Sequence, residues 1–91
     1  MKVSELKFKS KQCEENTLWM VNTDLGKITV LHRRTGWGGG LFDTETGYKA
    51  PDGKFWLASD MFDIRDYPDL ELEQAIEKIK IYANTCVGVM S

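Results

Sequence analysis

The C-terminal third of the chain carries the pattern that most restricts what it can fold into. From Leu72 onward, apolar residues recur at the three- and four-residue spacing that marks one face of an α-helix. Asp69 precedes this run as a predicted N-cap, and Gly88 follows it as a predicted terminator. The predicted apolar arc consists of Leu72, Ala75, Ile76, Ile79, Tyr82, Ala83 and Cys86. Such a helix needs an apolar partner surface, which the rest of the chain must supply.

The first half of the chain has the composition of β-strands. Residues 17–22 and 27–34 are rich in β-branched and aromatic side chains, and the turn residues between them end at Gly26. We therefore predict an antiparallel hairpin here, and we expect residues 17–21 to be buried on both faces. Further strands are predicted at residues 3–9 and 55–58, with polar residues 9–16 as a connection.

Strands followed by one helix indicate an α+β fold. We predict an antiparallel sheet of about four strands, with one C-terminal amphipathic helix packed on one face. The length of 91 residues is that of a single compact domain spanning 1–91. No apolar run approaches the length of a membrane span, and no signal-peptide core opens the chain, so we expect a cytoplasmic protein with two reduced thiols, Cys13 and Cys86.

A glycine-rich segment between the predicted strands is the clearest functional signal. Residues 35–40 read Thr-Gly-Trp-Gly-Gly-Gly, so that one large aromatic sits in an adaptable loop. Aromatic residues on loops are common binding anchors, because they bury a large area at a low entropic cost. The predicted partner contacts of this region are Arg33, Arg34, Trp37, Phe42 and Tyr48.

The C-terminal part of the chain is acidic. Residues 60–91 carry seven Asp and Glu against three Lys and Arg, whereas residues 1–34 carry seven Lys and Arg against four acids. Asp60, Asp63 and Asp66 are predicted contacts for a basic partner. Leu70 and Ile81 project away from the predicted apolar arc of the helix. They indicate a second contact face, for a homodimer or another partner.

No arrangement of residues in the sequence indicates catalysis. The chain has a single histidine, His32, with no nucleophile placed beside it. The aspartates between residues 60 and 69 recur at every third position, which is not the alternate spacing of a calcium loop. The glycine-rich segment lacks the Gly-Lys-Ser/Thr and the following helix of a phosphate-binding loop. We therefore expect no metal and no cofactor.

The sequence best fits a small non-enzymatic protein-binding domain. Compact acidic chains of this size are a common format for phage or mobile-element accessory proteins that inhibit a host enzyme or defence complex. If the partner is a nucleic-acid-handling enzyme, the acidic residues could occupy its basic groove.

Two other functions are consistent with the sequence. One is nucleic-acid binding by the basic N-terminal strands, through Lys7, Lys9, Lys11 and the arginine pair, although a pI near 5.3 is unusual for such a domain. The other is a small enzyme subunit whose site is completed by oligomerisation.

Overall fold

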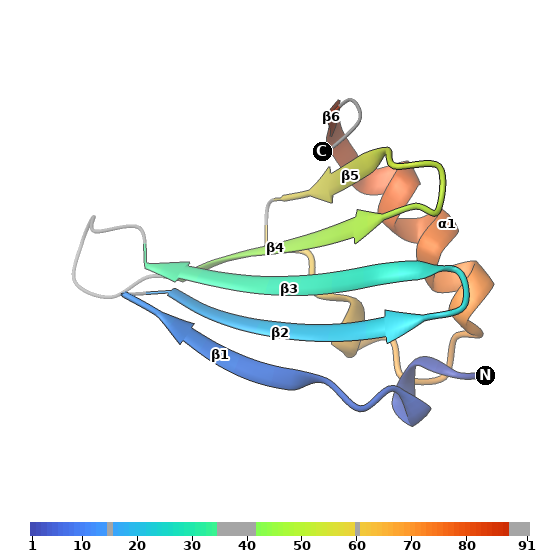
Figure 1. The fold of residues 1–91 in the computed structure, drawn as a ribbon, viewed down its shortest axis with the longest axis horizontal. Coiled ribbons are helices and arrows are strands. Elements are labelled where there is room, and N and C mark those ends of the chain that lie inside the picture. The colour runs from blue at the N-terminus through green and yellow to red at the C-terminus, as the bar shows by residue number, and fades with distance from the viewer. Residues whose placement is uncertain (15, 35–41, 60, 88–91) are drawn as a thin grey trace.

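In the computed structural model, the chain forms one antiparallel sheet with an α-helix packed against it (Figure 1). The structure describes residues 1–14, 16–34, 42–59 and 61–87. The strands are β1 (Lys9–Cys13), β2 (Asn16–Thr23), β3 (Gly26–Arg34), β4 (Phe42–Lys49), β5 (Phe55–Ala58) and β6 (Ala83–Val87). The helical elements are the 3-10 turns η1 (Val3–Glu5) and η2 (Ile64–Asp66) and the helix α1 (Leu72–Tyr82).

The order of the strands in the sheet is their order in the chain. Strands β1 to β5 form a meander of consecutive antiparallel pairs, and β6 returns after α1 to pair with β5. The helix packs against β4 and β5. The predicted α+β class is therefore confirmed, and the described residues form six strands where about four were predicted.

The turn between β2 and β3 confirms the predicted hairpin. The Thr23 hydroxyl accepts hydrogen bonds from the backbone N–H groups of Leu25 and Gly26, at 3.2 and 3.1 Å. Gly26 has a φ of 143°, and a Cβ there would lie 2.3 Å from the carbonyl oxygen of Lys49. The turn therefore requires glycine, both for its backbone conformation and for the close approach of β4.

The N-terminal part of the chain differs from the prediction. Residues 3–9 were expected to form a strand and residues 9–16 a connection, but η1 occupies Val3–Glu5 and β1 begins at Lys9. Strand pairing is made by backbone groups, so the polar segment pairs with β2 despite its side chains. Lysines are common on such edge strands, where they discourage pairing with other chains.

The helix is shorter at both ends than its apolar pattern predicts. It begins after Glu71, which serves as N-cap in place of Asp69 and forms a capping box with Gln74. It ends at Tyr82, and β6 follows directly. Asn, Thr and Val, which are weak helix formers, make up most of this last segment. Tyr82 is 49% exposed and Cys86 lies in a strand, so neither belongs to a helical core face as predicted.

The core lies between α1 and one side of the sheet. Ile28 and Val30 on β3 are fully buried there, against the buried Ala75, Ile76 and Ile79 of the helix. Val3 from η1 and Ile64 from η2 join the same cluster. All helical elements therefore contribute apolar side chains to one face of the sheet, which we call the inner face.

Candidate functional site

The opposite side of the sheet, which we call the open sheet face, is the first candidate site. Successive side chains of a strand point to opposite faces, so the residues between the buried positions of β3 point away from α1. Cross-strand pairing then places Leu18 opposite Leu31, and Gly47 opposite Leu57. The large apolar side chains of the open sheet face are Leu18, Met20, Leu31, Phe55 and Leu57.

These five side chains are separate from the core. Each is only partly buried, and none belongs to the core cluster or packs against it, whereas their inner-face neighbours Trp19, Val21 and Trp56 do. No helical element in the described ranges covers them, because η1, η2 and α1 all pack on the inner face. An antiparallel sheet with one face in water normally carries polar residues at these positions. The open sheet face therefore carries large apolar side chains among polar ones.

One aromatic ring of this face reaches over a glycine of the neighbouring strand. A Cβ at Gly47 would lie 2.5 Å from the Cζ atom of Phe55, so the ring of Phe55 occupies the space over Gly47. Because Phe55 and Gly47 lie on adjacent strands, the ring covers the backbone of β4 directly. The glycine thereby leaves room for the ring of Phe55 over β4.

Lysines frame the apolar side chains. Alternation along the strands places Lys9 and Lys11 of β1, Lys27 of β3 and Lys49 of β4 on the open sheet face, of which the first three are exposed. Glu45 is the described acidic residue on the same face. The face therefore combines apolar side chains on β2, β3 and β5 with a net positive charge.

Among the predicted contacts, Asp63 has a structural position. It is 9% exposed and caps η2 by accepting a 2.8 Å hydrogen bond from the backbone N–H of Arg65. The Arg65 guanidinium also contacts it, with Nη2 2.8 Å from Oδ2. Burial by itself would raise the pKa of Asp63, but hydrogen bonds from Arg65 and His32 outweigh burial and lower it. Asp63 therefore anchors η2 rather than offering a charge to a partner.

His32 and Trp19 complete the cluster around Asp63. The His32 Nε2 lies 3.3 Å from Asp63 Oδ2 and 2.9 Å from Arg65 Nη2. To accept a hydrogen bond from Arg65, Nε2 must carry no proton. To donate one to Asp63, it must carry a proton. The His32 Nε2 therefore makes one of these two hydrogen bonds at a time. The guanidinium of Arg65 also lies over the Trp19 ring, 4.3 Å from its centroid. The cluster binds η2 to β2 and β3, and His32 has the structural role that its position in a strand suggests.

Tyr48 is also part of the folded framework. It is 4% exposed, and its hydroxyl donates a hydrogen bond to the carbonyl oxygen of Leu25 in the β2–β3 turn. Burial and, to a lesser extent, the charge of Asp52 raise the pKa of Tyr48. The residue points into the inner face, so it cannot serve as the surface anchor that was predicted.

The remaining predictions around the glycine-rich segment stay open. Trp37 and Asp60 lie outside the described residues, and so do the side chains of Arg33, Arg34 and Phe42. The backbone of this region is paired, with Arg34 of β3 opposite Phe42 of β4. Their role as partner contacts therefore remains a prediction.

The two residues of the predicted second contact face, Leu70 and Ile81, belong to one surface of the molecule. Leu70 packs against the edge of the core, whereas Ile81 is 75% exposed at the end of α1. Both line one shallow hollow on the outer side of the helix, together with Glu77 and Lys78. Asp66 is exposed nearby in sequence, at the end of η2. This surface carries one strongly exposed aliphatic side chain, compared with five large apolar side chains on the open sheet face.

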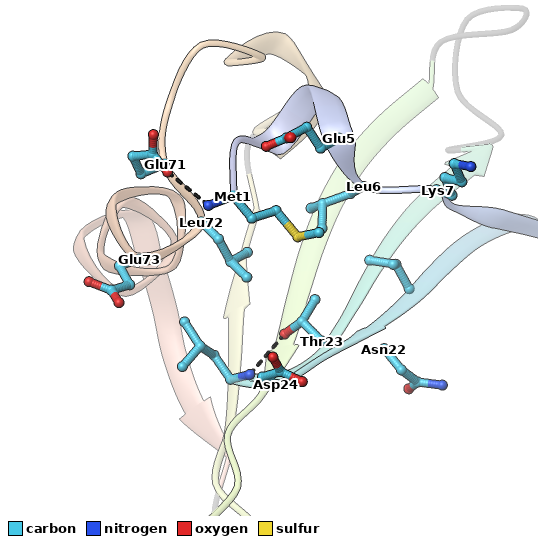
Figure 2. Close-up of a pocket in the computed structure, with 12 residues that line it drawn as sticks. Met1, Glu5, Leu6, Lys7, Asn22, Thr23, Asp24, Glu71, Leu72 and Glu73 are labelled. Atoms are coloured by element: carbon cyan, nitrogen blue, oxygen red, sulfur yellow. Dashed lines mark hydrogen bonds and ion pairs between the residues drawn. The ribbon is translucent and has the colours of Figure 1, made fainter.

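A second hollow has walls from three distant parts of the chain (Figure 2). It lies between the η1 region, the β2–β3 turn and the start of α1, with a volume of about 760 Å³. Sequence reasoning missed both this cavity and the open sheet face. The apolar residues of β2 and the acids near residue 71 are visible in the sequence, but which of them share a surface depends on strand register and chain packing.

Three further observations concern metal binding, membrane crossing and similarity to known proteins. The described ranges contain no group of three His, Cys, Asp or Glu side chains that could hold a metal ion. In the same ranges, no helix has the length and apolar character needed to cross a bilayer. Comparisons of the chain with family models, with curated proteins and with solved structures found no significant match.

Proposed function

We propose that this chain is a protein-binding domain whose open sheet face receives an apolar and acidic segment of its partner. The observation that supports this most directly is the position of Leu18, Met20, Leu31, Phe55 and Leu57 outside the core. Apolar patches of this kind, rimmed by polar residues, are typical of interaction sites. A bound segment would remove these side chains from water, which is the main favourable contribution to such a complex.

The charge of the face defines the partner further. Lys9, Lys11 and Lys27 favour acidic side chains at the edge of the complex, where complementary charges set orientation and association rate. The same lysines oppose the stacking of two copies face to face, because like charges would meet. The proposed occupant is therefore another protein, with acidic residues flanking an apolar stripe.

A nucleic acid fits the same face less well. Proteins that bind single strands stack bases on several aromatic side chains, and Phe55 is the one aromatic among the described residues of this face. The aliphatic side chains of Leu18, Met20, Leu31 and Leu57 have no counterpart in a phosphate backbone. The lysines alone do not account for these apolar side chains.

Such a domain acts by binding a segment of its partner and blocking that segment's other interactions. A segment held on the open sheet face is withdrawn from its other contacts, so inhibition of a partner enzyme or complex is the simplest effect of binding. This proposal keeps the accessory-protein role predicted from the sequence but moves the binding surface from the glycine-rich segment to the sheet.

Selection from a displayed library of random peptides tests the proposal without knowledge of the partner. We expect the enriched peptides to combine Leu, Ile or Phe with Asp or Glu. The purified peptides should bind the wild-type chain and lose at least about tenfold in affinity for Met20→Glu, because a carboxylate replaces one of the apolar side chains of the face and repels an acidic peptide. Ile81→Glu, which changes the outer side of α1, is the matched control and should bind normally.

A second variant separates binding from folding. The double reversal Lys9→Glu/Lys11→Glu changes two exposed side chains on the edge strand, so it should fold normally and still weaken acidic peptides. Enrichment of basic peptides, or equal losses in Ile81→Glu and Met20→Glu, would contradict the proposed surface. Tighter binding of an oligothymidine than of any selected peptide, with a steep salt dependence, would instead support nucleic-acid binding.

A further inference from the structure

The outer side of α1 is open to solvent, because the buried residues of the helix all point to the core. The residues that line its shallow hollow are Leu70, Glu73, Gln74, Glu77, Lys78 and Ile81. Ile81 is 75% exposed, the highest value among the large apolar side chains that the structure describes. Beyond it, the exposed Met61 and Tyr82 line an adjoining hollow, so the surface continues past the end of the helix.

The outer side of α1 matches itself when the helix is reversed. Leu70 and Ile81 are equally far from the midpoint between residues 75 and 76, and so are Gln74 and Glu77. When a second copy of α1 lies antiparallel on the first with the midpoints aligned, Leu70 of each copy contacts Ile81 of the other. The layer inside this one pairs Gln74 of each copy with Glu77 of the other.

This inner layer joins a donor to an acceptor. The side-chain oxygen of Gln74 accepts a 3.2 Å hydrogen bond from the backbone N–H of Glu71, so the amide nitrogen of Gln74 remains as a donor. Glu77 is exposed and supplies acceptor oxygens. A parallel copy would instead place Glu77 against Glu77. The layer therefore favours the antiparallel arrangement.

The charges beside these layers also favour an antiparallel copy. Glu71 and Glu73 lie at the start of α1, whereas Lys78 and Lys80 lie in its second half. Because successive residues of a helix are about 100° apart, Glu73 and Lys80 share one flank of the layers. Glu71 and Lys78 share the other flank. Antiparallel pairing brings the acidic end of each flank to the basic end of the same flank in the second copy, and the helix dipoles then oppose each other.

The charged groups are placed for such pairs. Figure 2 shows Glu73 pointing away from the cavity beside the β2–β3 turn. The Nζ atom of Lys80 lies 3.9 Å from Oε1 of Glu77, beside the layers. Lys78 lies over the ring of Tyr82, 5.3 Å from its centroid, and has no carboxylate partner among the described residues.

We infer that the outer side of α1 binds a second copy of this chain, with the two helices antiparallel about a two-fold axis at residues 75 and 76. The surface is smaller than a standard interface, so the dimer exchanges with the monomer. The open sheet face lies on the far side of the sheet from α1 and stays accessible in both copies. The inference is therefore independent of the proposed function.

Sedimentation velocity over a range of concentrations tests the association. We expect the mass to rise from that of one chain toward that of two by about 1 mM, a concentration that populates even weak pairs. Isotope-filtered NOE spectra of mixed labelled and unlabelled chain test the register. Methyl groups of Leu70 should contact Ile81 of the other copy, whereas contacts between Ile81 and Ile81 would indicate a parallel pair and contradict the inference.

Two substitutions of exposed residues locate the contact. Ile81→Glu should weaken the dimer by at least about tenfold, because a carboxylate is then placed against Leu70 at both ends of the pair. Lys27→Glu, on the open sheet face, is the control and should dimerise like the wild type. Both positions are exposed, so folding should be unchanged, as circular dichroism would confirm.

Charge reversal on one flank tests the pairing itself. Glu73→Lys and Lys80→Glu should each weaken self-association by roughly tenfold, since two attractive pairs become repulsive and each exposed pair contributes a factor of about five or less. An equimolar mixture of the two variants should associate again, because each pair on this flank then joins a lysine to a glutamate.

Three results would overturn the inference. The mass of a single chain at every concentration would leave the outer side of α1 to a different partner. Equal association of wild type and Ile81→Glu would place the contact between copies elsewhere on the molecule. A mixture of Glu73→Lys and Lys80→Glu that stays monomeric would exclude the antiparallel flank pairs.

Discussion

Both faces of the sheet carry apolar side chains, but the two faces differ in what lies over them. On the inner face, Ile28 and Val30 are fully buried beneath α1. On the open sheet face, Leu18 and Leu31 sit opposite each other and remain partly exposed. The apolar residues of the inner face stabilise the fold by forming its core. Those of the open sheet face lie outside the core, and their exposure lowers solubility. This difference is the basis of the interaction proposed above for the outer positions.

The largest effect should come from the inner face. Ile28→Ala removes a fully buried side chain beneath the helix and is expected to cost about 2–5 kcal/mol of unfolding free energy. Urea denaturation followed by tryptophan fluorescence would measure it. A loss below about 1 kcal/mol would mean that this face is not the principal core.

The cluster that joins η2 to the sheet should rank second. Asp63→Asn removes charge-assisted hydrogen bonds from Arg65 and should cost about 1–3 kcal/mol at neutral pH. Because the pKa of Asp63 is lower in the folded state, its stabilisation is present above the unfolded value, about 3.9, and is lost as the pH falls through the folded pKa.

Denaturation curves between pH 2 and 7 would test that sign. Wild type and Asp63→Asn should converge in stability at low pH and differ most near neutrality. Asp66→Asn, on the neighbouring exposed carboxylate, serves as control and should follow the wild-type curve. A constant difference at every pH would show that Asp63 acts through its shape rather than its charge.

Gly47→Ala tests the centre of the open sheet face. The added methyl group would meet the ring of Phe55, so we expect a loss of about 1–3 kcal/mol and displacement of the ring. In the double variant Gly47→Ala/Phe55→Leu the collision is relieved, and the two substitutions should show a favourable coupling. Strictly additive losses would indicate that the ring does not rest on Gly47.

The smallest effect on stability should come from an outer apolar position. Leu31→Thr on the open sheet face should change unfolding free energy by less than about 1 kcal/mol, because the side chain lies outside the core cluster and threonine favours strands. The same substitution should weaken selected acidic peptides. A stability loss as large as that of Ile28→Ala would mean that the outer face is structural.

The sequence predicted the elements of the fold whose signals are local. The hairpin of residues 17–22 and 27–34 corresponds to β2 and β3, because Gly26 and the β-branched residues around it act over short distances. The helix was predicted from its periodicity, but its end was not, since pairing of β6 with β5 competes with helix propensity. Strand β1 was missed for the same reason: backbone pairing with β2 outweighs its polar composition.

The candidate sites were harder to predict because they depend on register and packing. Residues 17–21 were expected to be buried on both faces, but Leu18 and Met20 have no cover among the described residues. Asp63 and Tyr48 were predicted as contacts, and their burial becomes visible only when η2 and β4 are placed. Glu5, Asp24 and Glu71 are far apart in sequence, so no local pattern could reveal that they surround one cavity.

The match between strand order and chain order has a consequence for how the molecule assembles. Strands β2 to β5 each pair with the preceding strand, so that part of the sheet can form by closing short loops, which costs little conformational entropy. The bridge between Lys2 and Glu71 instead joins segments about 70 residues apart in the chain. We expect this junction to close late in folding, and the cavity beside it to be completed only then. Amide exchange should accordingly be faster there than in β3, where backbone groups are paired on both sides.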